Sequence, residues 1–315
     1  LSFSGTPRQL FVNKNRLLVF TDIYPEYPAY KDILPSPAVQ ERGILPPIPY
    51  APPKTGVYIY DTRNKEAPKL VANYTVEGYY YESRMIGDYV YVVAQHQSYS
   101  YGGGPVPLPA IESNMGTVAT SPVYYFDNYE PSLNFNSIAS FNLFDLDDVQ
   151  LRSYLLGYAN TLYVSQNAIY LAYQKQVPYR YYEQQAFDLW KNAVMPSVSS
   201  DARKTMQNIV DSNLETYLKQ QRLTEALENY FNSLAGTESE RVRRQLEEKM
   251  AAWSQQQQEE QMKTIIHKLA LNKGDVRYVT KGEVKGTLLN QFSLDEYADH
   301  LRVATTVDLY GRDHV

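Results

Sequence analysis

The sequence predicts a mainly β protein that is built from tandem four-stranded antiparallel units and interrupted by an α-helical insertion. Short strands rich in Val, Ile, Leu and Tyr recur in pairs along the 315 residues. Three longer strand pairs each end in a glycine, and the long insertions all fall at the same point of the repeat. Tandem four-stranded antiparallel units are typical of a β-propeller, which is therefore the predicted fold.

Each unit is predicted to begin with a tight hairpin. Four such hairpins span residues 9–20, 83–93, 161–173 and 295–305. Their turns are predicted at Lys14-Asn15, Gly87-Asp88, Gln166-Asn167 and Asp299-His300. Asn, Asp and Gly are common in such turns because they tolerate a positive φ or cap the turn with a side chain.

A second hairpin completes each of the first three units. These hairpins span residues 56–78, 137–157 and 264–286, and they end at Gly78, Gly157 and Gly286. The blades are accordingly predicted at residues 6–78, 79–158 and 159–286, with half of a fourth from residue 287. A propeller closes with about four to eight blades, so about three and a half blades indicate that these residues belong to a longer protein.

The insertions lie between the second and third strands of the units. Residues 1–175 are predicted to hold the first two blades and the start of the third, with Pro- and Tyr-rich insertions at 21–55 and 96–136. Residues 176–263 are predicted to be helical, with Gly236 ending one helix and the capping box Thr237-Glu-Ser-Glu240 opening the next. Residues 264–315 complete the third blade and form half of a fourth.

Composition excludes several classes of function. The chain has no cysteine, four histidines and a net charge of −5. Disulfide scaffolds and Cys-ligated metals are therefore excluded, and the acidic balance argues against a nucleic-acid partner. No run of about 18 apolar residues could span a membrane. The motifs of zinc proteases, serine hydrolases and nucleotide-binding loops are absent, so the sequence disfavours an enzyme without deciding the question.

Tyrosine occurs 30 times and provides the candidate binding residues. Tyrosine clusters in and beside the insertions could form a platform for a protein or a glycan, or could serve only to pack blades and anchor loops. The candidate contact residues are Tyr99, Tyr101, Tyr124, Tyr125, Tyr179, Tyr181 and Tyr182.

Two further motifs have a structural and a functional interpretation. Asn73-Tyr-Thr75 fits an N-glycosylation acceptor, which matters only in a secreted protein. Asp145-Leu-Asp147-Asp148 could bind calcium through its carboxylates, but its position in the repeat favours a hairpin turn. No other metal or cofactor site is predicted. His267 alternates along a strand and is interpreted as a structural residue.

Three segments also resemble a known family. Residues 5–13, 76–93 and 288–306 are similar to secreted proteins with a C-terminal β-propeller domain distantly related to WD-40 repeats, which occur mostly in thermophilic archaea. The resemblance implies an extracellular or cell-surface location, with any membrane anchor outside these residues. It implies a chain that begins after the first blade and stops before the last ones. It supplies no catalytic residues.

Three functional hypotheses remain open. The first is a non-catalytic binding or scaffolding module that contacts protein or glycan at the cell surface through its insertions, because insertions on one face of a repeat protein often bind. The second is a self-assembling structural subunit of a surface filament or layer. The third is a hydrolase that acts in the propeller channel, which rests on fold analogy alone.

Overall fold

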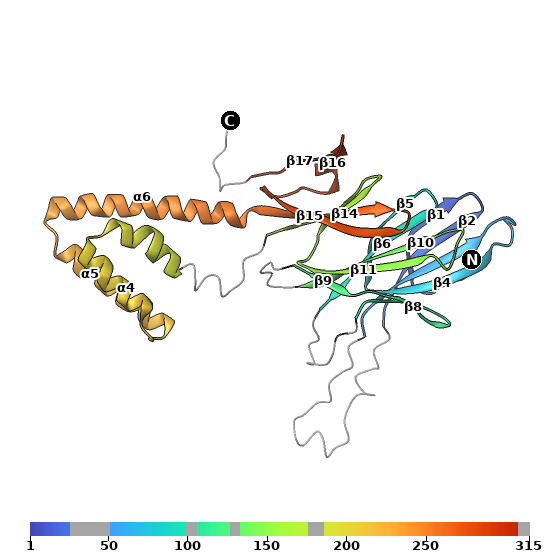
Figure 1. The fold of residues 1–315 in the computed structure, drawn as a ribbon, viewed down its shortest axis with the longest axis horizontal. Coiled ribbons are helices and arrows are strands. Elements are labelled where there is room, and N and C mark those ends of the chain that lie inside the picture. The colour runs from blue at the N-terminus through green and yellow to red at the C-terminus, as the bar shows by residue number, and fades with distance from the viewer. Residues whose placement is uncertain (26–50, 99–105, 107, 127–132, 176–185, 308–315) are drawn as a thin grey trace, which may run out of the picture. The chain divides into compact units, whose positions relative to one another are not determined.

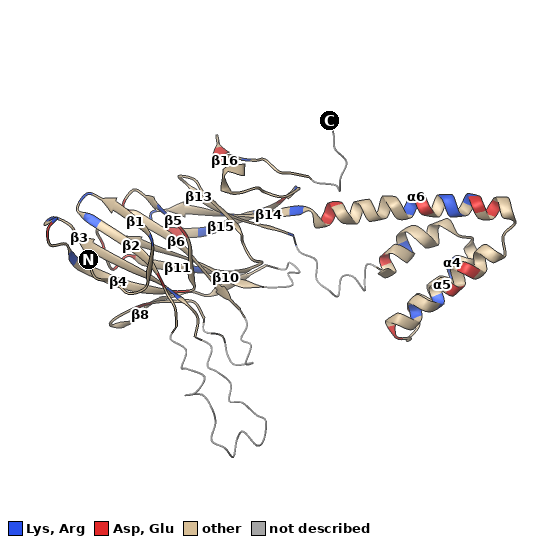
Figure 2. Cartoon of the chain, turned by 180° about the vertical axis from the view of Figure 1, so that it is seen from behind, with Lys and Arg blue, Asp and Glu red and all other residues tan. Residues whose placement is uncertain are grey.

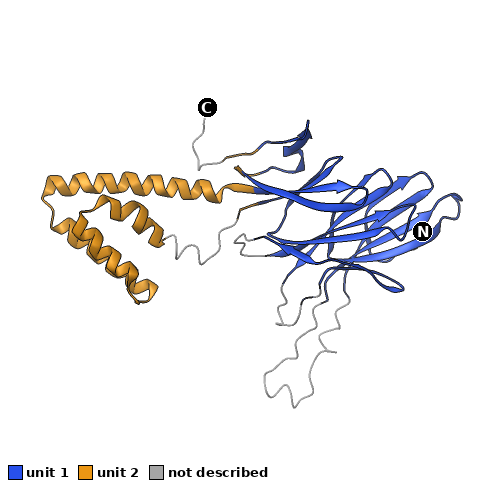
Figure 3. Ribbon diagram, viewed as in Figure 1, with its two compact units in different colours: residues 1–173, 265–283, 288–304 blue, residues 174–264, 284–287, 305–315 orange. Residues whose placement is uncertain are grey.

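A computed structural model describes residues 1–25, 51–98, 106, 108–126, 133–175 and 186–307. The chain divides into two compact units (Figure 3). The first comprises residues 1–173, 265–283 and 288–304, and it contains the β-sheets (Figure 1). The second comprises residues 174–264, 284–287 and 305–315, and it contains the helices.

The first sheet has the strand order β1-β2-β3-β4-β7-β8. Four of its strands follow one another along the chain: β1 (Thr6–Asn13), β2 (Arg16–Ile23), β3 (Lys54–Asp61) and β4 (Lys69–Glu77). They pair in antiparallel fashion, and the β1–β2 turn lies at Lys14-Asn15 as predicted, with a φ of 52° at Lys14.

The second sheet has the order β5-β6-β10-β11-β9. Its strands are β5 (Tyr79–Ile86), β6 (Tyr89–Gln97), β10 (Asn134–Asn142), β11 (Val149–Leu156) and β9 (Val123–Tyr125). All its pairs are antiparallel except β11–β9, which is parallel. Gly78 connects it to the first sheet with a φ of 112°, and a Cβ at this glycine would lie 2.9 Å from the backbone nitrogen of Gln95.

The third sheet has the order β12-β13-β14-β15 and the fourth contains β16 and β17. Their strands are β12 (Thr161–Val164), β13 (Ala168–Gln174), β14 (Lys263–Asn272), β15 (Asp275–Lys285), β16 (Leu294–Tyr297) and β17 (His300–Val303). The last turn differs from the prediction by one residue, because Ala298 and Asp299 have the positive φ and His300 begins β17. None of the four sheets closes on itself within the described residues.

The insertion at 96–136, predicted as loop, contains three strands. β7 (Ala110–Ser113) pairs with the outer strand β4, and β8 (Gly116–Thr120) pairs with β7. β9 covers the outer edge of β11. The edge of a sheet leaves backbone N–H and C=O groups unpaired, so a nearby segment gains hydrogen bonds by adding to it. Ile111 of β7 is thereby buried in the core.

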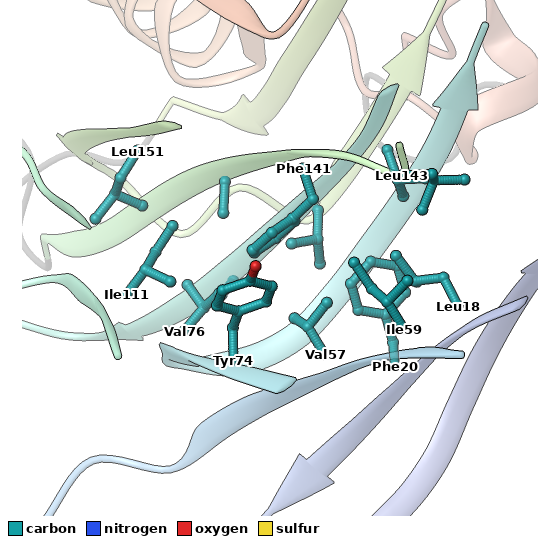
Figure 4. Close-up of a cluster of buried hydrophobic side chains, with 14 residues drawn as sticks. Leu18, Phe20, Val57, Ile59, Tyr74, Val76, Ile111, Phe141, Leu143 and Leu151 are labelled. Carbon is teal, nitrogen blue, oxygen red and sulfur yellow. The ribbon is translucent and has the colours of Figure 1, made fainter. Parts of the chain in front are cut away.

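The main core lies between the first two sheets (Figure 4). Side chains from β2 and β3 face side chains from β6, β10 and β11, because successive side chains in a strand point to opposite faces. Tyr74 and Phe141 pack with their ring centroids 5.2 Å apart, and the Tyr74 hydroxyl donates to the carbonyl of Leu146 (2.7 Å). The cluster includes Leu18, Phe20, Val57, Ile59, Val90, Val92, Leu143 and Leu151.

The helical unit has its own core. After a helical segment over residues 186–189 come a π-helical turn (Trp190–Val194), a 3₁₀ turn (Met195–Ser197), α4 (Ser200–Asp211), α5 (Thr216–Asn232) and α6 (Gly236–Gln261). Its buried side chains include Val194, Met206, Leu223, Phe231, Val242 and Leu246. Acidic and basic residues are interspersed along α6 (Figure 2). No helix among the described residues is sufficiently long and apolar to cross a membrane.

The predicted helix boundaries near residue 236 were wrong. Gly236 is the first residue of α6 rather than a cap after α5, and α5 ends at Asn232. The helix therefore starts before the capping-box residue Thr237, and its N-cap, Ala235, makes no side-chain hydrogen bond. By contrast, Ser199 caps α4 by accepting a hydrogen bond from the N–H of Ala202 (3.3 Å).

An acidic side chain is buried where β7 joins the first sheet. Glu77 is 8% exposed, and its Oε2 atom has no hydrogen-bond partner. Lys54, which is opposite Glu77 on β3, instead pairs with Glu112 of β7 (2.5 Å). Burial raises the pKa of Glu77 to about 6, and the charge of Glu112 adds to the rise while that of Lys54 opposes it. The ionised form of Glu77 is thus disfavoured in the folded protein.

We expect Glu77→Gln to stabilise the protein at neutral pH. The pKa of Glu77 in the folded protein lies above the value of 4.5 expected in the unfolded chain. Ionisation of Glu77 therefore lowers the free energy of unfolding as pH rises from 4.5 through 6. Relative to the wild type, the free energy of unfolding of the variant should be higher by up to about 2 kcal/mol at pH 7.5 and nearly unchanged at pH 4. Urea unfolding followed by tyrosine circular dichroism checks this. Glu66→Gln, in an exposed turn, is the control, and equal effects of both variants at both pH values would contradict the prediction.

Candidate binding site at the tyrosine edge

Two of the predicted contact residues lie in the short strand β9. Tyr124 and Tyr125 pair with Tyr154 and Leu155 of β11, at the outer edge of the second sheet. They are 46% and 75% exposed. The other predicted contact residues, Tyr99, Tyr101, Tyr179, Tyr181 and Tyr182, lie outside the described residues. We call the exposed part of β9, Tyr124 and Tyr125, the tyrosine edge.

The two tyrosines do not form one continuous surface. Neighbouring side chains of a strand point to opposite faces, so Tyr124 and Tyr125 extend to different sides of β9. Tyr124 stacks on the buried ring of Tyr154, with centroids 5.6 Å apart and planes inclined by 30°. No ring contact is found for Tyr125 among the described residues, and it is the more exposed of the pair.

Tyr124 lies on a layer of aromatic rings in which Tyr154 is buried and Phe126 and Tyr278 are half-buried. Phe126 lies 6.4 Å from Tyr154 and 4.6 Å from Tyr278 of β15, measured between ring centroids. Burial raises the pKa of Tyr154 to about 12, so its hydroxyl remains protonated at neutral pH. Stacking on Tyr154 restricts the side chain of Tyr124, which lowers the entropy that a stacked ligand would have to remove.

His267 lies within the same aromatic layer. Its Nε2 atom is 3.2 Å from the hydroxyl of Tyr173, and its Nδ1 atom is 3.4 Å from that of Tyr278. The ring is buried and lies 4.9 Å from that of Phe126. Burial lowers the pKa of His267 to about 4, with the charge of Lys281 contributing, so the imidazole is neutral at pH 7. These partners lie on β13, on β15 and in the segment after β9, and the sequence singles out only His267 among them.

The remaining candidate residues lie elsewhere. Asn73 is a half-buried residue within β4, opposite Tyr58, whereas glycosylation acceptors usually lie in exposed loops. Asp145, Asp147 and Asp148 form the β10–β11 turn, where the carbonyl of Asp145 accepts from the N–H of Asp148 (3.1 Å) and the carboxylate of Asp148 accepts from the Tyr89 hydroxyl (2.7 Å). Calcium binding and glycosylation stay predictions.

The tyrosine edge presents exposed aromatic rings with hydroxyl tips. Stacked rings with polar tips suit the apolar face of a sugar ring or an extended side chain. Among the described residues, no three His, Asp or Glu side chains converge in a way that could hold a metal ion. The imidazole of His267 is enclosed by tyrosines and is not accessible to a ligand at the edge.

Two archaeal proteins are similar to this chain. An uncharacterized protein of Methanocaldococcus jannaschii is 25% identical over 253 residues, which cover 79% of this chain and 38% of the relative. An uncharacterized protein of Archaeoglobus fulgidus is 27% identical over 267 residues, which cover 80% of this chain and 39% of the relative. The chain therefore spans well under half the length of either relative.

No solved structure matches the chain significantly. The family described as "Beta propeller domain" matches residues 1–314, which is nearly the whole sequence. The strand-rich first unit agrees with this match. The chain therefore belongs to the β-propeller domain family.

Proposed function

We propose that the chain is a non-catalytic β-propeller module that acts outside the cell or on its surface and binds protein or glycan through its insertions. In this proposal β1–β4, β5-β6-β10-β11 and β12–β15 are three blades, and β16–β17 are half of a fourth. The placement outside the cell rests on the resemblance to secreted propeller proteins.

The observation that carries the proposal is the tyrosine edge. The three insertions connect β2 to β3, β6 to β10 and β13 to β14, and each of these pairs is adjacent in its sheet. The insertions thus leave all three sheets at the equivalent end. The described part of the second insertion places two exposed tyrosines there, and Tyr124 stacks on the buried ring of Tyr154. Exposed aromatic side chains with fixed orientation are typical contact residues.

Truncation of the tyrosine edge is expected to weaken binding. We expect Tyr124→Ala to reduce affinity for a bound glycan or protein by about tenfold, because central aromatic contacts are worth more than about 1 kcal/mol. Tyr125→Ala, made separately, tests the opposite side of β9. A glycan array, followed by titration of each positive oligosaccharide, measures the effect. Tyr217→Ala, an exposed tyrosine of α5, is the matched control. Equal affinities of all three variants would contradict the proposal.

A specific observation favours self-assembly as a second candidate function. Leu10 and Val12 of β1 are exposed on the first sheet, and large exposed apolar side chains often mark contacts. Negative-stain electron microscopy of the full-length protein distinguishes the two functions. Isolated particles are expected for the binding module, and filaments or layers for a structural subunit.

A further inference from the structure

A groove runs along the first strands of the sheets, away from β9. Three adjoining cavities of about 410, 320 and 370 Å³ lie beside β5 and β12 and opposite residues 288–299. Arg84 and Tyr163 line the first two cavities, and Leu162 and Phe292 line the second and third. Because neighbouring cavities share walls, they form one elongated space, which we call the first-strand groove. Each cavity is in the size range of ligand sites.

Backbone edges line this groove. β5 and β12 are each the first strand in their sheet's order, so one edge of each has no strand partner within the described residues. Side chains satisfy two backbone N–H groups in the walls instead. The N–H of Ser83 donates to Oε1 of Glu82 (3.0 Å), and the N–H of Glu296 donates to the Tyr163 hydroxyl (3.1 Å). A peptide carbonyl could replace either acceptor, as it does when an extended peptide adds to a sheet edge.

The groove contains an unpaired cation where the first and second cavities meet. Arg84 lies between the first and second cavities and is exposed, and its guanidinium has no hydrogen-bond or ion-pair partner in the described part of the chain. Glu296, in the same wall, is already held by Lys268 (3.0 Å) and Tyr170 (2.7 Å). Asp299 lies in the exposed β16–β17 turn at the rim. A free guanidinium suits a carboxylate, which it can bind through two hydrogen bonds.

Exposed apolar side chains line the third cavity beside polar ones. Phe292 and Leu289 are 85% and 84% exposed, and they line the third cavity together with Tyr81 and Leu162. Such large exposed apolar side chains beside a cavity are typical of binding grooves. The groove therefore combines a free cation, sheet edges and exposed apolar side chains.

We propose that the first-strand groove binds an extended peptide that presents a carboxylate to Arg84 and a large apolar side chain to Phe292. The free strand edges favour a peptide over a glycan, because a glycan lacks the alternating backbone N–H and C=O groups that pair with a strand edge. This site shares no residue with the tyrosine edge, so the inference does not depend on the proposed function. The carboxylate belongs either to an acidic side chain or to the carboxyl terminus of the peptide.

Synthetic peptides test the proposal. Fluorescein-labelled peptides of about eight residues, with alternating β-branched and polar residues and one leucine, would be titrated against the whole chain by fluorescence anisotropy. One set ends in a free carboxylate, and the matched set ends in an amide and carries an internal glutamate. Binding by the first set alone identifies the carboxyl terminus as the ligand group, and binding by the second identifies the side chain.

Matched variants make the result decisive. Arg84→Gln is expected to weaken peptide binding by about 10- to 100-fold, in line with charge-assisted hydrogen bonds. Phe292→Ala should weaken it about tenfold. Arg277→Gln, an exposed arginine on β15 outside the groove, and Tyr124→Ala should leave it unchanged. The proposal is overturned if no peptide binds at about 1 mM, if Arg84→Gln and Arg277→Gln act alike, or if neutral oligosaccharides compete for the groove.

Discussion

Phe141→Ala is expected to destabilise the first unit by about 3–5 kcal/mol. The ring is fully buried in β10 and packs against Tyr74 within the core shared by the first two sheets (Figure 4). Its removal leaves a cavity that strands on both sides cannot close without breaking their pairing. Because domains are stable by only about 5–15 kcal/mol, this loss is a large share of the total.

The two units permit an internal control for this measurement. The sequence has two tryptophans, Trp190 and Trp253, and both lie in the helical unit. Tryptophan fluorescence therefore reports on that unit, and tyrosine circular dichroism reports mainly on the sheets. We expect a lower urea midpoint in the tyrosine signal for Phe141→Ala. Met115→Ala, at an exposed turn, should change it by less than about 0.5 kcal/mol. Phe141→Leu provides an intermediate case if the alanine variant does not fold.

Equal urea midpoints for Phe141→Ala and Met115→Ala would contradict the contribution of this core to stability.

His267 should make the first unit sensitive to acid. Its folded pKa of about 4 lies below the value of 6.5 expected when unfolded, so the unfolded chain binds a proton that the buried ring excludes. The stability contribution is present above pH 6.5 and is lost as pH falls from 6.5 to 4. The loss amounts to about 3 kcal/mol.

His267→Gln isolates this effect, because an amide can contact both tyrosine hydroxyls but does not titrate in this range. We expect the variant to be less stable than the wild type at pH 7.5 and the difference to shrink or reverse at pH 4. Urea midpoints at pH 7.5, 5.5 and 4.0 measure it. The raised pKa of Glu77 changes stability with pH in the opposite direction. The effect of His267 is therefore read from the difference in unfolding free energy between the variant and the wild type at each pH. A difference that stays constant with pH would contradict the assignment.

Much of the first unit was predictable because its signals are local. Strand alternation and turn residues place the β1–β2 hairpin with Lys14 at a positive φ, and glycine at position 78 matches a backbone that other residues rarely adopt. Gly286 likewise has a positive φ of 92°, while Gly157 is not in that region. The helical character of the third insertion was also predictable from its apolar spacing, but the boundary near Gly236 was not.

The binding features were less predictable. β7, β8 and β9 form because the sheet edges formed by other strands offer hydrogen bonds, which no window of residues 96–136 reveals. Tyr173, one of the two hydroxyl partners of His267, lies 94 residues away in the sequence. The first-strand groove depends on residues from β5, β12 and the segment before β16.

The sequence by itself determined the first hairpin and its turn, the helical character of the third insertion and the absence of cysteine chemistry, because these depend on neighbouring residues and on composition. Only the tertiary structure decided that Tyr124 rests on Tyr154 while Tyr125 faces away, that Glu77 is buried without a full set of partners, and that Arg84 remains unpaired in a groove. Burial, pKa and ligand access arise from contacts between distant segments, so they become visible only when the sheets are assembled.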